Sequence, residues 1–213
     1  MTQPALFIEP PAAPAEPSTR GWEQISAPGA LICIKRSFLG PVAATKLLRR
    51  LIDVVPWRQD KIKIFGKEHD LPRLQQWYGD PGQVYLWSGI EMRPLPWIPE
   101  LLEVREAVQR ATKRDFNSVL LNYYRDGNDT VSWHADDEPG LGLSPFIASL
   151  SVGAERDFLL RRTDDKTEKR NIKLTHGSLL VMGGETQGNW QHAIPRRKRV
   201  TEPRVNLTFR EFE

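Results

Sequence analysis

Apolar and polar residues alternate without a break along the last predicted strand, residues 204–210. Side chains of opposite parity point to opposite faces of a β-strand. One face is therefore apolar and suited to a protein core: Val205, Leu207 and Phe209. The other face interleaves two arginines with two hydrogen-bonding residues: Arg204, Asn206, Thr208 and Arg210. Such a polar face is suited to binding a small dianion such as a dicarboxylate, or it lies in water as in many antiparallel sheets.

The N-terminal part of the chain has the spacing of amphipathic helices. Apolar residues recur at helical spacing from Pro41 to about Val55, with the proline in the opening turn and Ser37 as the predicted N-cap. A second helix is predicted from about Pro99 to about Thr112. A strand is expected at 31–35, and short strands and turns at 61–90. Residues 1–20, rich in proline, alanine and glutamate, predict a disordered tail.

From residue 117 onward the hydrophobic period changes to two, which predicts strands. Strands are expected at 118–125, 130–135, 146–153, 156–162, 170–175, 178–183, 189–194 and 204–211, with turn-forming residues between most of them. Many short strands at near-regular spacing indicate an antiparallel sandwich or jelly roll. We expect the two helices to pack outside one of its sheets, which gives an α+β protein.

The composition indicates a globular protein but does not indicate its function. The 213 residues are 39% hydrophobic and 27% charged, as in globular proteins, and fit one large domain. A net charge of +3 permits binding to nucleic acid but does not require it. The single cysteine, Cys33, excludes an intramolecular disulfide and a zinc ribbon, and its apolar surroundings predict a buried strand position. We find no signal peptide or apolar run long enough for a membrane span, and expect a cytoplasmic protein.

Two histidines and one carboxylate form a candidate metal site. His134 and Asp136 are two residues apart on a strand-like segment, a spacing that directs both side chains to one face, and His192 follows in a later strand. Two histidines and a carboxylate on one face are the ligands of non-heme Fe(II), because the remaining positions stay open to cosubstrate and oxygen. We interpret the other two histidines, His69 and His176, as structural or solvated. Asn122 and Tyr124 share a strand face and are candidates for hydrogen bonds to the same dicarboxylate.

Six segments, in order and spacing, resemble the AlkB family of Fe(II)- and 2-oxoglutarate-dependent dioxygenases over about residues 60–211. They are Asn122–Gly127, His134–Glu138, Pro145–Gly153, His176–Met182, His192 and Arg204–Arg210. The likeness is greatest to the branch of the animal nuclear duplex-DNA repair enzymes, on the evidence of Phe65–Lys67, Pro72–Arg73, Tyr78–Asp80 and Tyr85–Gly89. The resemblance implies a double-stranded β-helix (jelly-roll) core in residues 117–213. Residues 21–116 would supply the flanking helices and a nucleotide-recognition lid within the same compact unit.

The resemblance also implies an activity and its cofactors. The family removes small alkyl groups from base nitrogens, as in 1-methyladenine and 3-methylcytosine, using Fe(II), O2 and 2-oxoglutarate and releasing formaldehyde, succinate and CO2. Carried over by position, His134, Asp136 and His192 would bind Fe(II). Arg204 would bind the distal carboxylate of 2-oxoglutarate with Tyr124 and Asn206, and Arg210 the carboxylate nearest the metal, with Asn122 and Thr208 lining the same pocket.

On the substrate side, the resemblance assigns Trp87 to stacking on a flipped-out base, whose Watson–Crick edge cannot be reached within a duplex. Asp137 and Glu138 would favour a cationic methylated base, and Phe65, at a predicted hairpin tip, would fill the gap left by flipping. Arg73, Tyr85 and Ser88 complete the expected substrate contacts. Basic residues that are either phosphate contacts or solvated charges are Arg161, Arg162, Lys169, Arg170 and Arg196–Arg199.

Three alternatives remain open from the sequence. The same chemistry could act on RNA or a protein side chain; a jelly roll could bind nucleic acid without catalysis; or a cupin-like metalloenzyme could work without 2-oxoglutarate. The favoured expectation is a monomer acting on alkylated DNA or RNA, with no membrane and no protein partner, in a bacterial cytoplasm.

Overall fold

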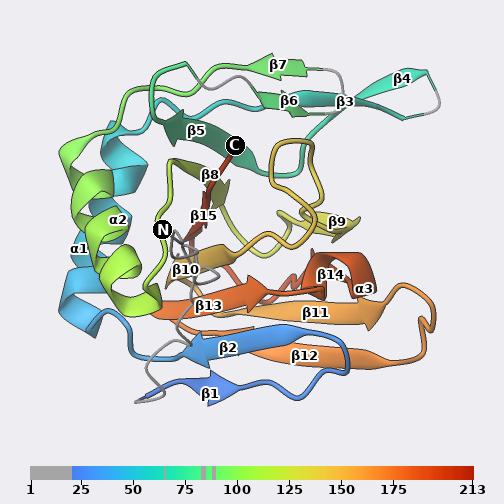
Figure 1. Cartoon of the computed structure of the whole chain (residues 1–213). Coiled ribbons are helices and arrows are strands. Elements are labelled where there is room, and N and C mark those ends of the chain that lie inside the picture. The colour runs from blue at the N-terminus through green and yellow to red at the C-terminus, as the bar shows by residue number, and fades with distance from the viewer. Residues whose placement is uncertain (1–20, 65, 83–84, 88–89) are drawn as a thin grey trace, which may run out of the picture.

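The computed structural model describes residues 21–64, 66–82, 85–87 and 90–213 (Figure 1). Two antiparallel sheets form its centre. The larger has the order β1-β2-β13-β10-β15-β8-β5, and the smaller the order β12-β11-β14-β9. The strands of the larger sheet are β1 (Glu23–Gln24), β2 (Leu31–Lys35), β5 (Leu74–Gly79), β8 (Ser118–Tyr124), β10 (Ile147–Gly153), β13 (Ser178–Gly183) and β15 (Arg204–Arg210). Those of the smaller sheet are β9 (Val131–His134), β11 (Arg156–Arg162), β12 (Lys169–Leu174) and β14 (Trp190–Ile194).

Helices and hairpins surround this sandwich. The helices are α1 (Pro41–Val54), α2 (Pro99–Thr112) and the short α3 (Thr186–Asn189). Two hairpins, β3 (Lys61–Ile64) with β4 (Lys67–Asp70) and β6 (Tyr85–Trp87) with β7 (Ile90–Met92), lie on the side of the molecule next to β5 (Figure 1). This arrangement confirms the predicted jelly roll with N-terminal helices. Within the described residues no helix is long and apolar enough to cross a membrane.

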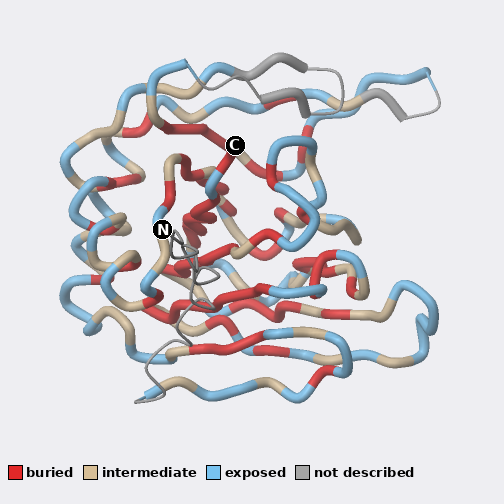
Figure 2. Tube along the Cα trace, in the orientation of Figure 1, coloured by how far each residue is buried: buried red, intermediate tan, exposed pale blue. Residues whose placement is uncertain are grey.

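The larger sheet is covered on both faces, and this decides the role of β15. The apolar residues Val205, Leu207 and Phe209 pack into one hydrophobic core with α1 and α2. A second core, which includes Phe158 and Leu160 of β11, fills the space between the two sheets. All seven residues of β15 are buried (Figure 2). The interpretation of its polar face as a surface in water is therefore wrong, since that face lies inside the sandwich.

The predicted cap of the first helix is wrong, although both long helices lie where the sequence places them. Gly40 occupies the N-cap of α1 with no side-chain cap hydrogen bond, while Ser37 lies in a turn before it. The chain enters α1 through a tertiary contact, because the Leu39 amide donates to the Gly177 carbonyl at 3.0 Å. With the N-terminal turn anchored and Pro41 fixing the first helical φ, the helix needs no serine cap.

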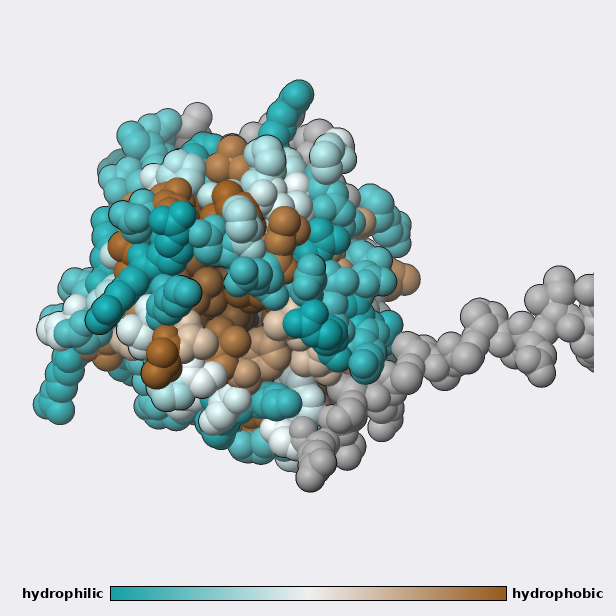
Figure 3. Space-filling model, turned by 90° about the vertical axis from the view of Figure 1, so that its left-hand side faces the viewer, coloured by the Kyte–Doolittle hydropathy of each residue, from teal (hydrophilic) through white to brown (hydrophobic). Residues whose placement is uncertain are grey.

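The helix side of the molecule carries a groove of its own. A hollow of about 1180 Å³ lies between α1 and α2, with apolar residues such as Val42, Leu47 and Val104 beside charged Arg49 and Glu103 (Figure 3). No residue that lines it also lines the cavity between the sheets. The candidate chemistry therefore gathers in the sandwich and not at the helices.

A buried ion-pair network on the outer face of the smaller sheet predicts a pH-dependent part of the stability. Asp157 is buried and accepts from Lys173 at 2.7 Å, from Asn171 at 3.2 Å and from Arg197. Burial alone would raise its pKa, but these hydrogen bonds lower the pKa to about 2, below the ordinary value of 3.8. A carboxylate whose pKa falls on folding stabilises the folded state above its unfolded pKa. That stability is lost as the pH falls through the folded pKa.

We expect Asp157→Asn to lower the free energy of unfolding near pH 7 by about 2 kcal/mol. The difference from the native protein should shrink as the pH falls from about 4 towards 2. Urea denaturation across this range measures both effects. Asp164→Asn is the matched control, because Asp164 pairs with Arg162 but its side chain is 66% exposed, so solvent screens the pair and little stability should change. Equal effects of the two substitutions would contradict the role given to burial.

Candidate metal and dicarboxylate site

A cavity of about 510 Å³ opens between the two sheets. Its walls come from strands of both sheets, chiefly β8 and β15 on one side and β9, β11 and β14 on the other. It holds the polar face of β15 together with the histidines and aspartate of the predicted metal site. The fold therefore brings together two motifs that lie about 70 residues apart in the sequence, since Asp136 and Arg210 are separated by 74 positions.

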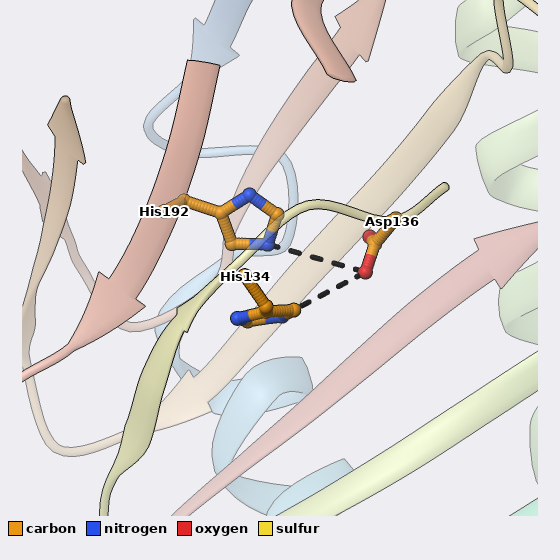
Figure 4. A group of neighbouring side chains, drawn as sticks. All are labelled: His134, Asp136 and His192. Carbon is orange, nitrogen blue, oxygen red and sulfur yellow. Dashed lines mark ion pairs between the residues drawn. The ribbon is translucent and has the colours of Figure 1, made fainter. Parts of the chain in front are cut away.

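The three predicted metal ligands converge in this cavity (Figure 4). His134 at the end of β9 pairs directly with His192 of β14, and Asp136 lies two residues after the end of β9. An oxygen of Asp136 lies 3.7 Å from Nε2 of His134 and 4.0 Å from Nε2 of His192. The ligand atoms of all three lie within 4.8 Å of one another, and no other such group occurs in the part of the chain that the structure describes. One small ion can contact all three.

The electrostatics of the site favour the protonation states that bind a metal. Burial lowers the pKa of His192 to about 3, so its imidazole is neutral at physiological pH. Burial alone would raise the pKa of Asp136, but the charge and hydrogen bond of Arg210, with smaller contributions from the neighbouring imidazoles, lower it to about 2. A neutral imidazole and an ionised carboxylate are the forms that coordinate a cation.

The tautomer of His134 is set by the backbone. Its Nδ1 lies 2.8 Å from the Ser132 carbonyl, which can only accept, so Nδ1 carries the proton and Nε2 keeps its lone pair. An outer hydrogen bond of this kind commonly orients a histidine towards a metal. His192 is held differently, by stacking on Phe158 with ring centroids 5.0 Å apart. The donor set of two histidines and one carboxylate fits Fe(II).

The polar face of β15 builds an anion site beside the ligands. Nη2 of Arg204 donates to Asn206 at 2.6 Å and to Ser151 at 2.9 Å. Its Nε and Nη1 atoms are buried and have no hydrogen-bond partner among the described residues. Burial lowers the pKa of Arg204 to about 10, which still leaves the guanidinium charged at physiological pH. A buried charge with unused hydrogen-bond donors destabilises the folded state unless a ligand accepts those hydrogen bonds. A carboxylate of 2-oxoglutarate can accept them and also neutralises the charge.

The second arginine connects the anion site to the metal ligands. Nη2 of Arg210 donates to Asp136 at 2.9 Å. The Asn206 amide donates to Thr208 at 2.8 Å, so the polar side chains of β15 form a continuous line from Arg204 towards Arg210. The predicted contributors from β8, Asn122 and Tyr124, also line the cavity. All the metal and cosubstrate residues expected from the sequence therefore face one cavity.

The expected substrate contacts are placed less completely. Asp137 and Glu138 line the cavity next to the metal ligands, and Arg73 lines its wall, where it donates to Asn122 at 2.7 Å. Burial lowers the pKa of Arg73. Phe65 and Ser88 lie outside the described residues. Tyr85 and Trp87 lie in β6, but their side chains are also outside the described part. The stacking role of Trp87 and the wedge role of Phe65 therefore remain predictions.

Most of the candidate phosphate-binding residues already have partners in the protein. Arg161 stacks on Trp133 with 4.4 Å between guanidinium carbon and ring centroid, and Arg162 pairs with Asp164. The others with side-chain partners are Arg170, with Glu168, Arg196, with Asn128, and Arg197, with Asp157. The side chains of Lys169, Lys198 and Arg199 are exposed and have no hydrogen bond or ion pair within the described residues. These three therefore remain the most available for a phosphate.

The structure adds site residues that the sequence did not indicate. Besides Phe158, they include Ser149, which donates to Asn206 at 3.1 Å, and Gln187, whose side-chain oxygen accepts from the Asp136 amide at 2.9 Å. Ser149 could have been found, because it shares parity with Ser151 in a predicted strand. Gln187 carries no such signal, since it lies in a short helix that the hydrophobic pattern did not predict.

Comparisons with known proteins agree with this geometry. A family model described as "2OG-Fe(II) oxygenase superfamily" matches residues 31–210. The mouse "DNA oxidative demethylase ALKBH2" is 42% identical over 201 residues, which cover 90% of this chain and 84% of that protein. The mouse "Alpha-ketoglutarate-dependent dioxygenase alkB homolog 3" is 42% identical over 188 residues, covering 84% and 65%. The solved structure of OsALKBH1 matches with a TM-score of 0.59 at 21% identity, over 88% of this chain and all of that one, which supports the fold.

Proposed function

The chain belongs to the AlkB family within the 2OG-Fe(II) oxygenase superfamily, and we propose that it repairs DNA by oxidative removal of small alkyl groups from base nitrogens. It is an Fe(II)- and 2-oxoglutarate-dependent dioxygenase that uses O2. The observation that carries the proposal is the single cavity in which the His134, Asp136 and His192 ligands adjoin the buried arginines of β15. Relatives with about 40% identity over most of the chain are named DNA oxidative demethylases.

The protein's part in the reaction is to bind, orient and exclude water. Bound Fe(II), with 2-oxoglutarate and O2, supplies the oxidising power that converts an N-methyl group to a hydroxymethyl group, which leaves as formaldehyde. His134, Asp136 and His192 would hold the metal through two imidazoles and one carboxylate. Arg204 and Arg210 would bind the two carboxylates of 2-oxoglutarate and so orient it in the cavity.

The acidic rim of the cavity favours cationic bases such as 1-methyladenine and 3-methylcytosine. Asp137 and Glu138 follow the ligand Asp136 directly and line the same cavity. A carboxylate near the base stabilises a positive charge, which methylation at these ring nitrogens creates. The anionic cosubstrate and the cationic base are thus drawn to different parts of the site, the arginines and the acidic rim. Because Asp136 itself is only 3% exposed, a base has to leave the stack to bring its alkyl carbon near the metal.

The test is incubation of the purified protein with Fe(II), 2-oxoglutarate and an oligonucleotide that contains 1-methyladenine, single-stranded or in a duplex. We expect the base to lose the mass of one methylene unit and formaldehyde to appear, both dependent on 2-oxoglutarate. If 2-oxoglutarate is turned over but the base is unchanged, the cofactor site is correctly assigned and the substrate is not. If a methylated RNA oligonucleotide is repaired in preference to the matched DNA, RNA is the substrate.

A further inference from the structure

A further buried arginine, in addition to Arg204 and Arg210 of β15, lies behind the cosubstrate site on the opposite sheet. Arg156, the first residue of β11, is 1% exposed. Its guanidinium carbon lies 5.5 Å from the ring centroid of Tyr124, and that of Arg204 lies 4.9 Å from the same centroid. Tyr124 therefore contacts a guanidinium from each sheet, at the end of the cavity where β8 pairs Tyr124 with Arg204.

The hydrogen bonds of Arg156 go to carbonyl oxygens of two separate loops. Nη1 donates to Asp126 at 3.1 Å, and Nη2 donates to Asp129 at 2.8 Å and to Pro195 at 2.7 Å. These loops follow β8, which carries Tyr124, and β14, which carries His192. The planar fork of an arginine can join carbonyls in this way, and a lysine cannot reproduce its geometry. Arg156 thus fixes the loops next to the distal end of the cavity.

In the described part of the chain, the acidic side chains that attract the charge of Arg156, those of Asp126 and Asp129, act from beyond ion-pair distance, and Asp129 is already paired with Arg125. Among the described residues neither Arg156 nor Arg204 forms an ion pair with a carboxylate. Carbonyl oxygens solvate a guanidinium but carry no net charge. Arginine remains protonated in proteins, so two cations face one tyrosine in a region shielded from water. A ligand that places a carboxylate there gains attraction from both.

We propose that Arg156 is a positioning residue for the cosubstrate. It holds Tyr124 and the adjoining loops, and it adds a second positive charge that selects 2-oxo acids with a distal carboxylate. The inference rests on the assignment of Arg204 to that carboxylate, and it concerns the cosubstrate and not the nucleic acid. Arg156 acts through Tyr124 and through the field in the cavity, without touching the reacting atoms.

The experiment compares two cosubstrates that differ only at the distal end. Binding of 2-oxoglutarate and of 2-oxobutyrate, which lacks the second carboxylate, is measured by calorimetry on the full chain loaded with Mn(II), so that no turnover is required. For Arg156→Met we expect the Kd of 2-oxoglutarate to rise by about tenfold or more, and that of 2-oxobutyrate to change by less than about twofold. Arg156→Lys keeps the charge and should retain most of the preference for 2-oxoglutarate. Arg105→Met is the matched control, because it removes the same charge from an arginine on the helix side that pairs with Asp80. It should leave the Kd of both ligands unchanged.

Several outcomes separate this inference from simpler roles. Equal weakening of both ligands by Arg156→Met, or a lower Tm with unchanged preference, would overturn it and leave a purely structural arginine. If the methionine variant does not fold, the lysine variant decides, since loss of the preference despite a retained charge would contradict the electrostatic part. If the native protein binds 2-oxoglutarate but does not demethylate DNA, the proposed function is wrong and the inference about Arg156 stands. If the native protein does not bind 2-oxoglutarate, both are wrong.

Discussion

Replacing Asp136 with asparagine should abolish 2-oxoglutarate-dependent demethylation, with a loss greater than about a hundredfold. Removing an outer hydrogen-bond partner of a metal ligand typically lowers metal affinity or activity by about ten- to a hundredfold, and Asp136 is assigned here as a ligand itself. Asparagine keeps the shape of the side chain but removes the charge that pairs with Arg210 at 2.9 Å. The cavity would then hold a buried guanidinium without its carboxylate and a metal site with two neutral ligands. Formaldehyde release and calorimetric Mn(II) binding measure the two losses separately.

The control for this substitution is Asp164→Asn, which removes the same charge at an exposed surface pair. It should leave both metal binding and formaldehyde release unchanged. A thermal melt of each variant shows whether the loss follows from unfolding. If Asp136→Asn kept metal affinity and activity within about tenfold of the native values, the assignment of Asp136 as a ligand would be wrong.

The elements were largely predictable from periodicity, because helices and strands repeat their apolar residues at different intervals. The helix from Pro99 to Thr112 and the strand from residue 156 to 162 coincide with the observed bounds. The cap of α1 was not predictable, since Leu39 is anchored by the distant Gly177 and this contact replaces a local one. Local preferences fail where a tertiary contact satisfies the same backbone group.

The role of β15 shows what an alternating pattern cannot decide. The same alternation of Arg204, Asn206, Thr208 and Arg210 suits a strand face in water and a strand face in a polar cavity. What separates these cases is whether another sheet covers the face, and that depends on strands β9, β11 and β14 folding over it. The predicted metal ligands His134, Asp136 and His192 favoured the polar cavity. The structure confirms that all three line one cavity together with the polar face of β15.

Residues that support the site were missed because their contacts are long-range. Phe158 stacks on His192, 34 positions later in the chain, and Gln187 accepts from the amide of Asp136 across 51 positions. Neither residue belongs to a motif with a fixed spacing. Arg156 is similar, since its three carbonyl partners come from two loops that lie on opposite sides of it in the sequence. Such residues become visible only when the fold places the segments together.

Replacing Arg210 with methionine should separate the 2-oxoglutarate dioxygenase from a metalloenzyme that needs no cosubstrate. Arg210 is 5% exposed and borders both the metal ligands and the polar line of β15. Removal of one partner from a buried, hydrogen-bonded charge pair typically costs 2–5 kcal/mol, which corresponds to about 30-fold to several thousand-fold in affinity. We therefore expect kcat/KM for 2-oxoglutarate to fall within that range. A cupin-like enzyme without a cosubstrate would keep its activity.

The accompanying measurements show which function of Arg210 is lost. Mn(II) binding should weaken far less than 2-oxoglutarate binding, because the three ligand side chains remain. Arg210→Lys should give an intermediate value, since an ammonium keeps the charge but not the planar fork that matches a carboxylate. Arg105→Met again controls for the loss of one positive charge. If Arg210→Met instead weakened Mn(II) and 2-oxoglutarate equally, its main role would be to hold Asp136, and the carboxylate nearest the metal would need another partner, for which Asn122 and Thr208 are the available polar groups.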